Sequence, residues 1–186
     1  ARGLAESREK AKALIMAGVV FVNGQREDKA GQNFPPEVTI EVRGNRLPYV
    51  SRGGLKLEKA MKEFPLSLTG KICMDVGAST GGFTDVLLRR GAASVVAVDV
   101  GYGQLAWKLQ SDPRVEVHDR TNVRTLDPAS VAPAPDIVVG DMSFISLTLV
   151  LPALVAAAAP DADFLLMVKP QFEVGKDRIG HGGVVR

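Results

Sequence analysis

The stretch from Asp75 to Asp85 reads Asp-Val-Gly-Ala-Ser-Thr-Gly-Gly-Phe-Thr-Asp, and it decides the fold of this 186-residue chain. It begins inside an aliphatic run, Ile72–Val76, and leads into a helical pattern that starts at Phe83. A glycine-rich turn between a strand and a helix brings backbone close to a ligand at the carboxyl end of the strand. The stretch therefore predicts a ligand-binding turn at the edge of a sheet.

Three ligands compete for such a turn. A phosphate-binding loop needs Gly-Lys-Ser/Thr, and the stretch has no lysine. A dinucleotide fingerprint needs glycine where Ser79 stands, which weakens that interpretation. The pattern acidic-x-Gly-x-Ser-x-Gly is typical of enzymes that bind S-adenosyl-L-methionine, which carries no phosphate. We therefore predict this cofactor, bound by the turn residues Asp75, Gly77, Ser79, Gly81, Phe83 and Thr84.

Two further aspartates follow the next aliphatic runs. Asp99 lies 22 residues after Gly77, where a carboxylate can accept hydrogen bonds from both ribose hydroxyls of a nucleoside. Asp119 comes just after the third run, at a place suited to an adenine amino group. Most aspartates at strand ends only cap helices or form turns. Three acids beside one glycine turn nevertheless favour a cofactor site that includes Asp99 and Asp119.

Beyond residue 62, short aliphatic runs alternate with helical patterns. Unbroken aliphatic runs joined through helices are typical of a parallel sheet buried on both faces. We expect strands at Ile72–Val76, Ser94–Asp99, Val115–Val117, Asp136–Val139 and Phe164–Val168. Helices are expected from Phe83 to Gly91, at Leu105–Leu109 and at Leu147–Ala158. The larger part of the chain is therefore predicted to be an α/β domain.

The first residues predict a smaller α+β module. Ser7 can cap a helix that stops near Gly18. The β-branched run Val19–Val22 then leads into Asn23-Gly24, a pair favoured in tight hairpin turns. A second strand is expected at Val38–Val42.

We expect the small module to cover residues 1–44 and a linker to cover residues 45–50. The α/β domain is then expected to cover residues 51–186, with Ser51 capping a helix that runs to about Phe64. Residues 1–62 carry 12 basic and 7 acidic side chains, a net charge of +5, whereas residues 63–186 carry a net charge of −3. A basic front end suggests an anionic partner. Arg8, Lys10 and Lys12 are the candidates for binding an RNA phosphate backbone, although a basic helix face is often merely solvated.

Three charged residues are candidates for the reaction itself. Asp141 is expected to end the fourth strand, in Gly-Asp-Met-Ser-Phe, and Lys169 the fifth, in Val-Lys-Pro-Gln-Phe-Glu. Burial and a nearby carboxylate could tune the proton affinity of Lys169, and a purely structural ion pair with Asp141 is the alternative. Lys56 lies in Ser-Arg-Gly-Gly-Leu-Lys-Leu, on the helix that leads into the sheet, and taken alone it would be an ordinary solvated lysine.

The residues near Asp141 disfavour two kinds of methyl transfer. Enzymes that methylate base amino groups usually carry Asn/Asp-Pro-Pro-aromatic at this place, and those prolines are absent here. Methylation of a pyrimidine ring carbon needs a cysteine nucleophile. The only cysteine, Cys73, lies inside the first expected strand and reads as a small buried hydrophobe.

Composition excludes other classes. With 46% hydrophobic residues the chain is too apolar for disorder, and its longest apolar stretch, Leu147–Ala159, is short of the ~20 residues of a membrane span. One cysteine cannot form an intramolecular disulfide, and the first residues lack the apolar centre of a signal peptide, which together favour the cytoplasm. His118 and His181 are isolated, so no metal site is expected.

The motifs together carry a family resemblance. Residues 7–24 resemble a small RNA-binding domain shared by a ribosomal small-subunit protein, pseudouridine synthases and tyrosyl-tRNA synthetases. The whole chain resembles the TlyA, or hemolysin-A, family, through the motifs that begin at Ser51, Asp75, Arg120, Asp141, Lys169 and Gly180. The resemblance implies a Rossmann-like S-adenosylmethionine-dependent methyltransferase that methylates ribose 2′-hydroxyls of ribosomal RNA, with cytidine as the expected nucleoside.

The resemblance also implies residue roles. A Lys-Asp-Lys-Glu tetrad is typical of the family, and its first three members match Lys56, Asp141 and Lys169. The fourth would lie beyond residue 186, so both ends of the sequence are expected to be truncated, and Glu173 is not assigned its role. The expected partners are ribosomal RNA or ribosomal subunits. A non-catalytic ribosome-binding factor and a cytolysin are the alternative functions.

Overall fold

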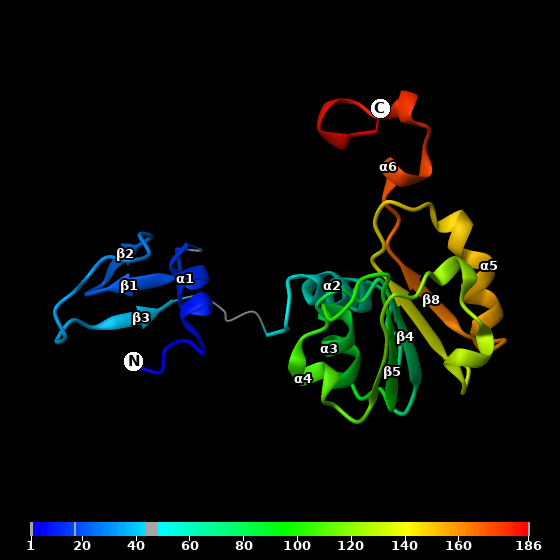
Figure 1. The fold of residues 1–186 in the computed structure, drawn as a ribbon, viewed down its shortest axis with the longest axis horizontal. Helices are drawn as coiled ribbons and strands as arrows, with labels where there is room; N and C mark the ends of the chain where they lie inside the picture. Colours follow the sequence, from blue (N-terminus) through cyan, green and yellow to red (C-terminus); the bar gives the residue numbers. More distant parts are fainter. Residues whose placement is uncertain (1, 17, 44–47, 186) are drawn as a thin grey trace. The chain divides into compact units, whose positions relative to one another are not determined.

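The computed structural model describes residues 2–16, 18–43 and 48–185, without the side chain of residue 176. They form two compact units, which divide between Pro48 and Tyr49 (Figure 1). The expected linker, residues 45–50, falls partly outside the described residues. Its last two residues, Tyr49 and Val50, belong to the second unit.

The first unit packs one helix beside a three-stranded antiparallel sheet. The helix is α1 (Arg8–Met16), and the sheet has the order β2-β1-β3, with β1 at Val20–Val22, β2 at Gln25–Glu27 and β3 at Ile40–Val42. Ser7 Oγ accepts a hydrogen bond from the Lys10 amide at 3.1 Å, which confirms the predicted cap. Asn23 and Gly24 both have positive φ, 49° and 81°, and form the predicted hairpin turn.

The hairpin partner of β1 differs from our prediction. We expected the next strand at Val38–Val42, but β2 follows the turn directly and pairs with β1, while β3 begins only at Ile40. The sequence Gln25-Arg26-Glu27 is polar throughout, so it shows no alternation of apolar residues. Pairing across the turn, rather than side-chain burial, makes it a strand.

The second unit is built on a five-stranded parallel sheet, as predicted. Its strands are β4 (Ile72–Val76), β5 (Ser94–Val98), β6 (Val115–His118), β7 (Ile137–Gly140) and β8 (Asp163–Leu166). The order is β6-β5-β4-β7-β8, so the chain moves first to one side of β4 and then to the other. Such a switch point leaves a crevice at the carboxyl ends of the two central strands, β4 and β7.

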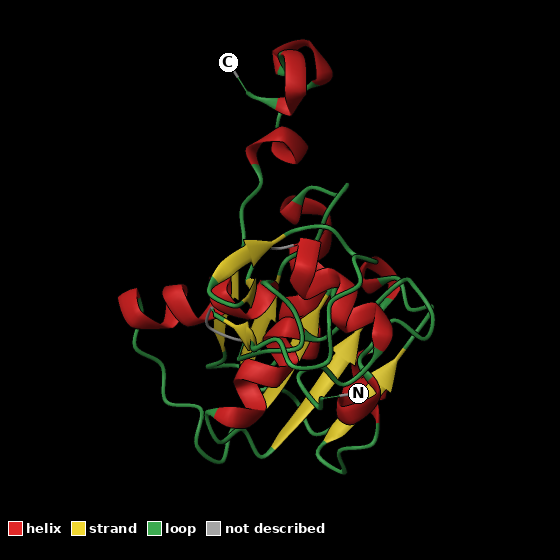
Figure 2. Cartoon of the chain, turned by 90° about the vertical axis from the view of Figure 1, so that its left-hand side faces the viewer, coloured by secondary structure: helices red, strands yellow, loops and turns green. Residues whose placement is uncertain are grey.

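Helices cover both faces of this sheet (Figures 1 and 2). They are α2 (Gly53–Glu63), α3 (Gly82–Arg89), α4 (Trp107–Gln110) and α5 (Leu147–Ala157). The one-turn helix α6 (Pro170–Glu173) lies beyond the carboxyl end of β8 (Figure 1), and short 3₁₀ turns lie at Val123–Thr125, Pro128–Val131, Lys176–Arg178 and His181–Gly183. One apolar core gathers around Leu57 and Leu87 on the α2 and α3 side. The other gathers around Met74 and Leu154 on the α5 side. Two cores hold the sheet rigid, which fixes the strand ends that carry the site.

The predicted cap of α2 is wrong. The helix begins at Gly53 after Arg52, with no side-chain cap. Ser51 instead lies against the start of α3, where its Oγ would be 2.3 Å from a Cβ placed on Gly82. In the part of the chain that the structure describes, no helix has both the length and the hydrophobicity to cross a membrane.

Candidate functional site

A buried carboxylate, that of Asp75, holds the glycine-rich turn in place through hydrogen bonds. Asp75 is 1% exposed, and its Oδ2 accepts hydrogen bonds from the amide and the hydroxyl of Thr84, at 2.9 and 2.7 Å. Burial raises the pKa of Asp75 to about 7, and the negative charges of Asp99 and Asp141 add to the rise, against the lowering effect of the Thr84 hydrogen bonds. Asp75 and Thr84 therefore tie the end of β4 to the start of α3.

The turn residues need the conformations that glycine allows. Gly77 has φ +77° and Gly81 φ +93°, and Ser79 also has a positive φ, +50°. A Cβ on Gly77 would lie 3.3 Å from Met142 Cγ. A Cβ on Gly81 would lie 2.3 Å from Leu109 Cδ1, so this glycine serves close packing rather than ligand contact.

Two cavities open at the carboxyl edge of the sheet. The first, of about 550 Å³, lies over β4 and β5 and is lined by residues that include Gly77, Asp99, Gln104, Asn122, Arg124, Asp141 and Phe144. The second, of about 530 Å³, is lined by residues that include Ser51, Arg52, Lys56, Asp75, Phe83, Ser143 and Lys169. Gly77, Ser79, Asp141 and Ser143 line both cavities. The site is thus a pair of compartments that meet at Asp141.

The predicted aspartates differ in their placement. Asp99 lines the first cavity, and its two oxygens accept hydrogen bonds from the Ser79 and Gly101 amides, each at 2.8 Å. Asp119 accepts from the Gly103 amide at 2.8 Å and is not among the described residues that line either cavity. Asn122 is on the cavity wall after the same strand. The Asp119 side chain is used to hold a neighbouring loop.

Three residues far apart in sequence form one charged cluster. Lys56 Nζ lies 2.6 Å from Asp141 Oδ2, and Lys169 Nζ lies 2.7 Å from Asp141 Oδ1. Lys169 also donates a hydrogen bond to Ser143 Oγ, at 2.6 Å. Burial raises the pKa of Asp141, but the two ammonium groups outweigh this and hold it below its ordinary value. The predicted cluster therefore exists as one ionised carboxylate between two lysines.

The members of the cluster are not equally exposed. The side chains of Asp141 and Lys169 are each 18% exposed, whereas that of Lys56 is 48% exposed. Asp141 comes one residue after the end of β7, and Lys169 three residues after the end of β8, so neither ends its strand as we expected. Asp141 and Lys169 therefore lie just beyond their strands, whereas Lys56 lies on α2. Asp141 and Lys169 are the less exposed part of the cluster, and Lys56 is its accessible part.

Cys73 supports the exclusion of a cysteine nucleophile. It is fully buried within β4, and burial raises the pKa of its thiol to about 12. A group that keeps its proton and does not reach a cavity is not poised to attack a base. Among the described residues, no three His, Cys, Asp or Glu side chains converge in a way that could hold a metal ion.

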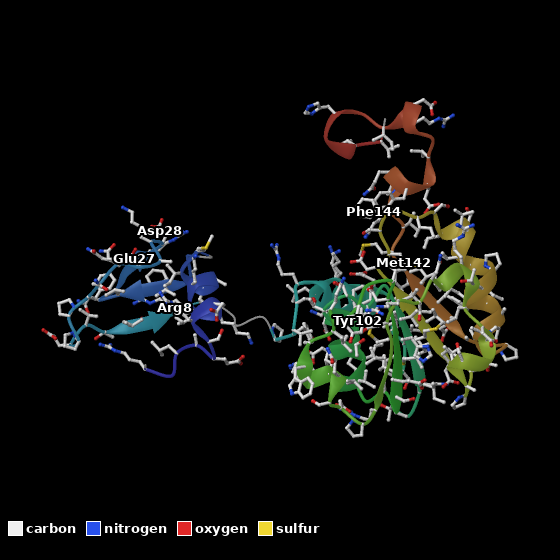
Figure 3. All side chains as sticks on the ribbon, viewed as in Figure 1. Arg8, Glu27, Asp28, Tyr102, Met142 and Phe144 are labelled. Carbon is white, nitrogen blue, oxygen red and sulfur yellow. The ribbon has the colours of Figure 1, made fainter. Side chains whose placement is uncertain are left out.

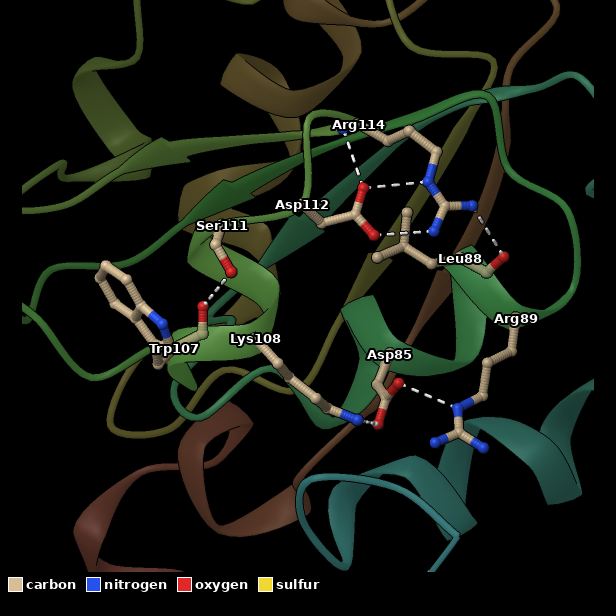
Figure 4. A network of polar contacts seen from close by, with 8 residues as sticks. All are labelled: Asp85, Leu88, Arg89, Trp107, Lys108, Ser111, Asp112 and Arg114. Atoms are coloured by element: carbon tan, nitrogen blue, oxygen red, sulfur yellow. Dashed lines mark hydrogen bonds and ion pairs between the residues drawn. The ribbon is translucent and has the colours of Figure 1, made fainter.

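Sequence reasoning missed an anchor beside the turn (Figure 4). Asp85 is 4% exposed, and it forms ion pairs with Arg89 at 3.0 Å and Lys108 at 3.1 Å. Its Oδ2 also accepts a hydrogen bond from the Val50 amide at 2.9 Å. The spacing of Asp85 and Arg89 on one helix face was a visible signal for the first pair. The contacts of Asp85 with Lys108 and Val50 depend on tertiary structure and have no local sequence signal. The same is true of the contact between Ser143 and Lys169.

The three predicted RNA-binding residues lie on α1. Arg8, Lys10 and Lys12 are exposed, and none of the residues of α1, all of which the structure describes, is buried. Lys10 forms an ion pair with Glu6. The three cations are available to solvent, with the charge of Lys10 partly compensated.

The residues present fit S-adenosylmethionine. The first cavity has the size of a small-molecule site, and it brings a strand-end carboxylate, Asp99, next to a turn where Gly77 leaves room that a Cβ would fill. The described lining of this cavity contains no lysine, and Arg124 is its one basic residue. A parallel sheet with this turn, this carboxylate and this switch point defines the class of Rossmann-like methyltransferases.

Comparisons with known proteins agree with this class. The profile of the FtsJ-like methyltransferase family matches residues 49–186, and that of the S4 domain matches residues 1–40. The chain is 54% identical over its whole length to YqxC of Bacillus subtilis, described as an rRNA methyltransferase, and covers 66% of it. It is 53% identical over 99% of its length to the 16S/23S rRNA (cytidine-2′-O)-methyltransferase TlyA of Mycobacterium tuberculosis, and covers 69% of it. The chain thus spans about two thirds of these curated relatives.

A solved structure agrees as well. A protein from Streptococcus thermophilus, described as a hemolysin, matches all of the chain with a TM-score of 0.77 and 48% identity, and the match covers 68% of that protein. The chain therefore belongs to the TlyA family of FtsJ-like methyltransferases, and in it an S4 domain precedes the methyltransferase domain.

Proposed function

We propose that the protein transfers a methyl group from S-adenosylmethionine to a ribose 2′-hydroxyl of ribosomal RNA. The observation that carries the proposal is the placement of the Lys56–Asp141–Lys169 cluster where the two cavities meet. The first cavity suits the donor nucleoside, and the second gives an RNA hydroxyl access to the lysines. When bound, the cofactor supplies an electrophilic methyl group on a sulfonium.

The protein's own residues position the hydroxyl and handle its proton. Holding two reactants in line supplies much of the acceleration in such a displacement. Lys169 is our candidate to steer the hydroxyl proton at Nζ, or to accept it once its ammonium has lost a proton to solvent. It is the lysine held by two partners, Asp141 and Ser143. Asp141 holds both lysines. Lys56, the more exposed, orients the hydroxyl from the open side.

Recognition of the RNA is divided between the two units. The S4 domain matches residues 1–40, and the exposed cations of α1 within it suit contacts to phosphates. We propose that the target nucleotide is extruded toward the cavities, which brings its hydroxyl to the lysines. By similarity to the M. tuberculosis relative we propose cytidine as the nucleoside, and ribosomal subunits in the cytoplasm as the substrate.

The test is methyl transfer from labelled S-adenosylmethionine to ribosomal subunits by the intact protein. We expect label in ribose 2′-O-methyl groups, identified after nuclease digestion by mass spectrometry. Lys169→Ala should lower the rate by about 10²–10⁴-fold, the usual contribution of a group that handles a proton. Cofactor binding, measured by calorimetry, should change little. Cofactor binding without any transfer by the wild type would favour a non-catalytic binding factor instead.

Matched variants separate the cluster from loss of charge alone. Lys71 is exposed and precedes β4, at the opposite edge of the sheet, so Lys71→Ala should transfer at the wild-type rate. Lys59 is exposed on the same helix as Lys56, and Lys59→Ala controls for Lys56→Ala. If Lys59→Ala lowered transfer as much as Lys56→Ala, the assignment of Lys56 would be wrong.

A further inference from the structure

Two segments at the carboxyl edge of the sheet in the second unit are held to each other by three contacts. Residues 141–147 follow β7, and residues 169–173 follow β8. Their first contact is the pairing of Lys169 with Asp141 and Ser143 described above. The second is a contact of aromatic rings between Phe144, labelled in Figure 3, and Phe172, with ring centroids 5.3 Å apart. A third contact is made by Glu173.

Glu173 binds the start of α5 with both carboxylate oxygens. Oε2 accepts a hydrogen bond from Ser146 Oγ at 2.6 Å, and Oε1 accepts one from the Leu147 amide at 2.9 Å. These hydrogen bonds hold the pKa of Glu173 below its ordinary value. Glu173 is the last residue of α6, whose N-cap is Lys169. The short helix α6 therefore connects Lys169 to the carboxylate that binds the start of α5.

We propose that Glu173 is a positioning residue, which clasps the start of α5 and thereby holds Lys169 against Asp141 and Ser143. The proposal rests on the proposed function, because it assigns Glu173 a role in methyl transfer through Lys169. A helix of four residues is only one turn long and cannot fix its own direction. The contacts of Lys169 fix one end of α6, and the hydrogen bonds of Glu173 to Ser146 and Leu147 fix the other end.

A simpler role for Glu173 is to cap α5. The first amides of a helix lack partners within it, and a carboxylate at this end is favoured by the helix dipole. Ser146 already accepts a hydrogen bond from the Thr148 amide, and Glu173 satisfies Leu147. Such a cap would stabilise α5 whether or not Lys169 is present. The two roles therefore differ in their dependence on Lys169.

The test substitutes Glu173 in two backgrounds. In the otherwise wild-type protein, Glu173→Ala should lower kcat about 10- to 100-fold, since a displacement of about 1 Å at a reacting group has this effect. KM for the RNA and the Kd of the cofactor should change by less than about twofold, because neither cavity is lined by Glu173. Glu173→Gln keeps one oxygen for the Leu147 amide and should recover part of the rate. Glu63→Ala, at an exposed acid at the end of α2, is the matched control.

In the Lys169→Ala background, Glu173→Ala should lower the residual rate by less than about twofold, as expected for two residues that act as one unit. An equal loss in both backgrounds would overturn the proposal and leave a helix cap. An unchanged kcat in the wild-type background would overturn it as well.

A second measurement does not depend on methyl transfer. Amine-specific labelling, quantified by mass spectrometry of peptides, reports how accessible the Lys169 ammonium is. Glu173→Ala should speed labelling of Lys169 several-fold relative to Lys71, because the freed α6 lets the lysine leave its partners. An unchanged rate would overturn the positioning role. If the wild type itself transfers no methyl group, the proposed function fails, and the labelling result still decides whether Glu173 positions Lys169.

Discussion

The two units place their functional residues on very different foundations. Among the described residues of the first unit, only Val20 and Val22 are buried apolar side chains, and α1 buries none. The second unit buries two apolar clusters, one on each face of its sheet. The first unit therefore presents exposed cations on a lightly packed support. The second holds a charged cluster on a dense one, as positioned chemistry requires.

The largest effect should come from cutting into the denser core. Leu87 is fully buried under the sheet, so Leu87→Ala should lower the free energy of unfolding of the second unit by about 2–5 kcal/mol. Val22→Ala in the first unit removes two methyl groups and should lower its stability by about 1–2 kcal/mol. Hydrogen exchange followed by mass spectrometry measures the two units separately.

Because each unit has its own buried residues, we expect each substitution to lower the stability of only the unit that carries it. Loss of protection in residues 20–42 after Leu87→Ala would contradict independent cores. Leu55→Ala is the matched control, because Leu55 is 47% exposed on α2 and its removal should change little.

The second effect concerns the buried acid under the turn. The pKa of Asp75 is raised to about 7 in the folded protein, above the ~4 of an unfolded chain, so the folded state binds a proton more tightly. The stability this contributes is complete below pH ~4 and is lost as the pH rises to about 7. Asp75→Asn keeps an oxygen for Thr84 and cannot ionise. Its stability relative to the wild type should therefore increase over this range by on the order of a few kcal/mol.

Urea unfolding of both proteins between pH 4 and 8, followed by a probe of the second unit, measures this difference. Parallel curves for wild type and variant would show that Asp75 does not titrate in this range. Asp163→Asn, at an exposed acid at the start of β8, controls for the loss of one carboxylate.

The sheet and the turn could be predicted because their signals are local. Five aliphatic runs predicted the strands to within a few residues, and the glycine-rich stretch predicted the turn between β4 and α3. The polar β2 could not be predicted, because only its pairing with β1 makes it a strand. The side-chain direction of Asp119 depends on the loop around Gly103, which no local pattern reveals. The charged cluster joins Lys56 to Asp141, a residue 85 positions away, and only a family resemblance indicated that Lys56 belongs to it.

The third effect tests the turn itself. Gly77 has a positive φ, lines both cavities and stands close to Met142. Gly77→Ala should weaken cofactor binding about 10-fold, because the added Cβ narrows the cavity beside Met142. The strain of about 1–2 kcal/mol that a Cβ brings at this positive φ lowers the stability of the fold, whether or not the cofactor is bound. Calorimetry with S-adenosylmethionine measures the Kd. Gly70 is the matched control, because it also has a positive φ, a Cβ there would meet no atom within 4 Å, and it lines neither cavity. Gly70→Ala should therefore leave the Kd unchanged.

The smallest effect belongs to the first unit. Replacing Arg8 and Lys12 by alanine should weaken RNA binding a few-fold and reduce the slope of log K against log salt by about 1–2, as loss of two phosphate contacts requires. Lys10→Ala should have a smaller effect, because Lys10 is paired with Glu6 and releases less counterion. Filter binding of an rRNA fragment across a salt series measures the affinity and the salt slope of the wild type and of both variants. A double variant with the wild-type slope would show that α1 is only a solvated face, and that the RNA is held elsewhere on the protein.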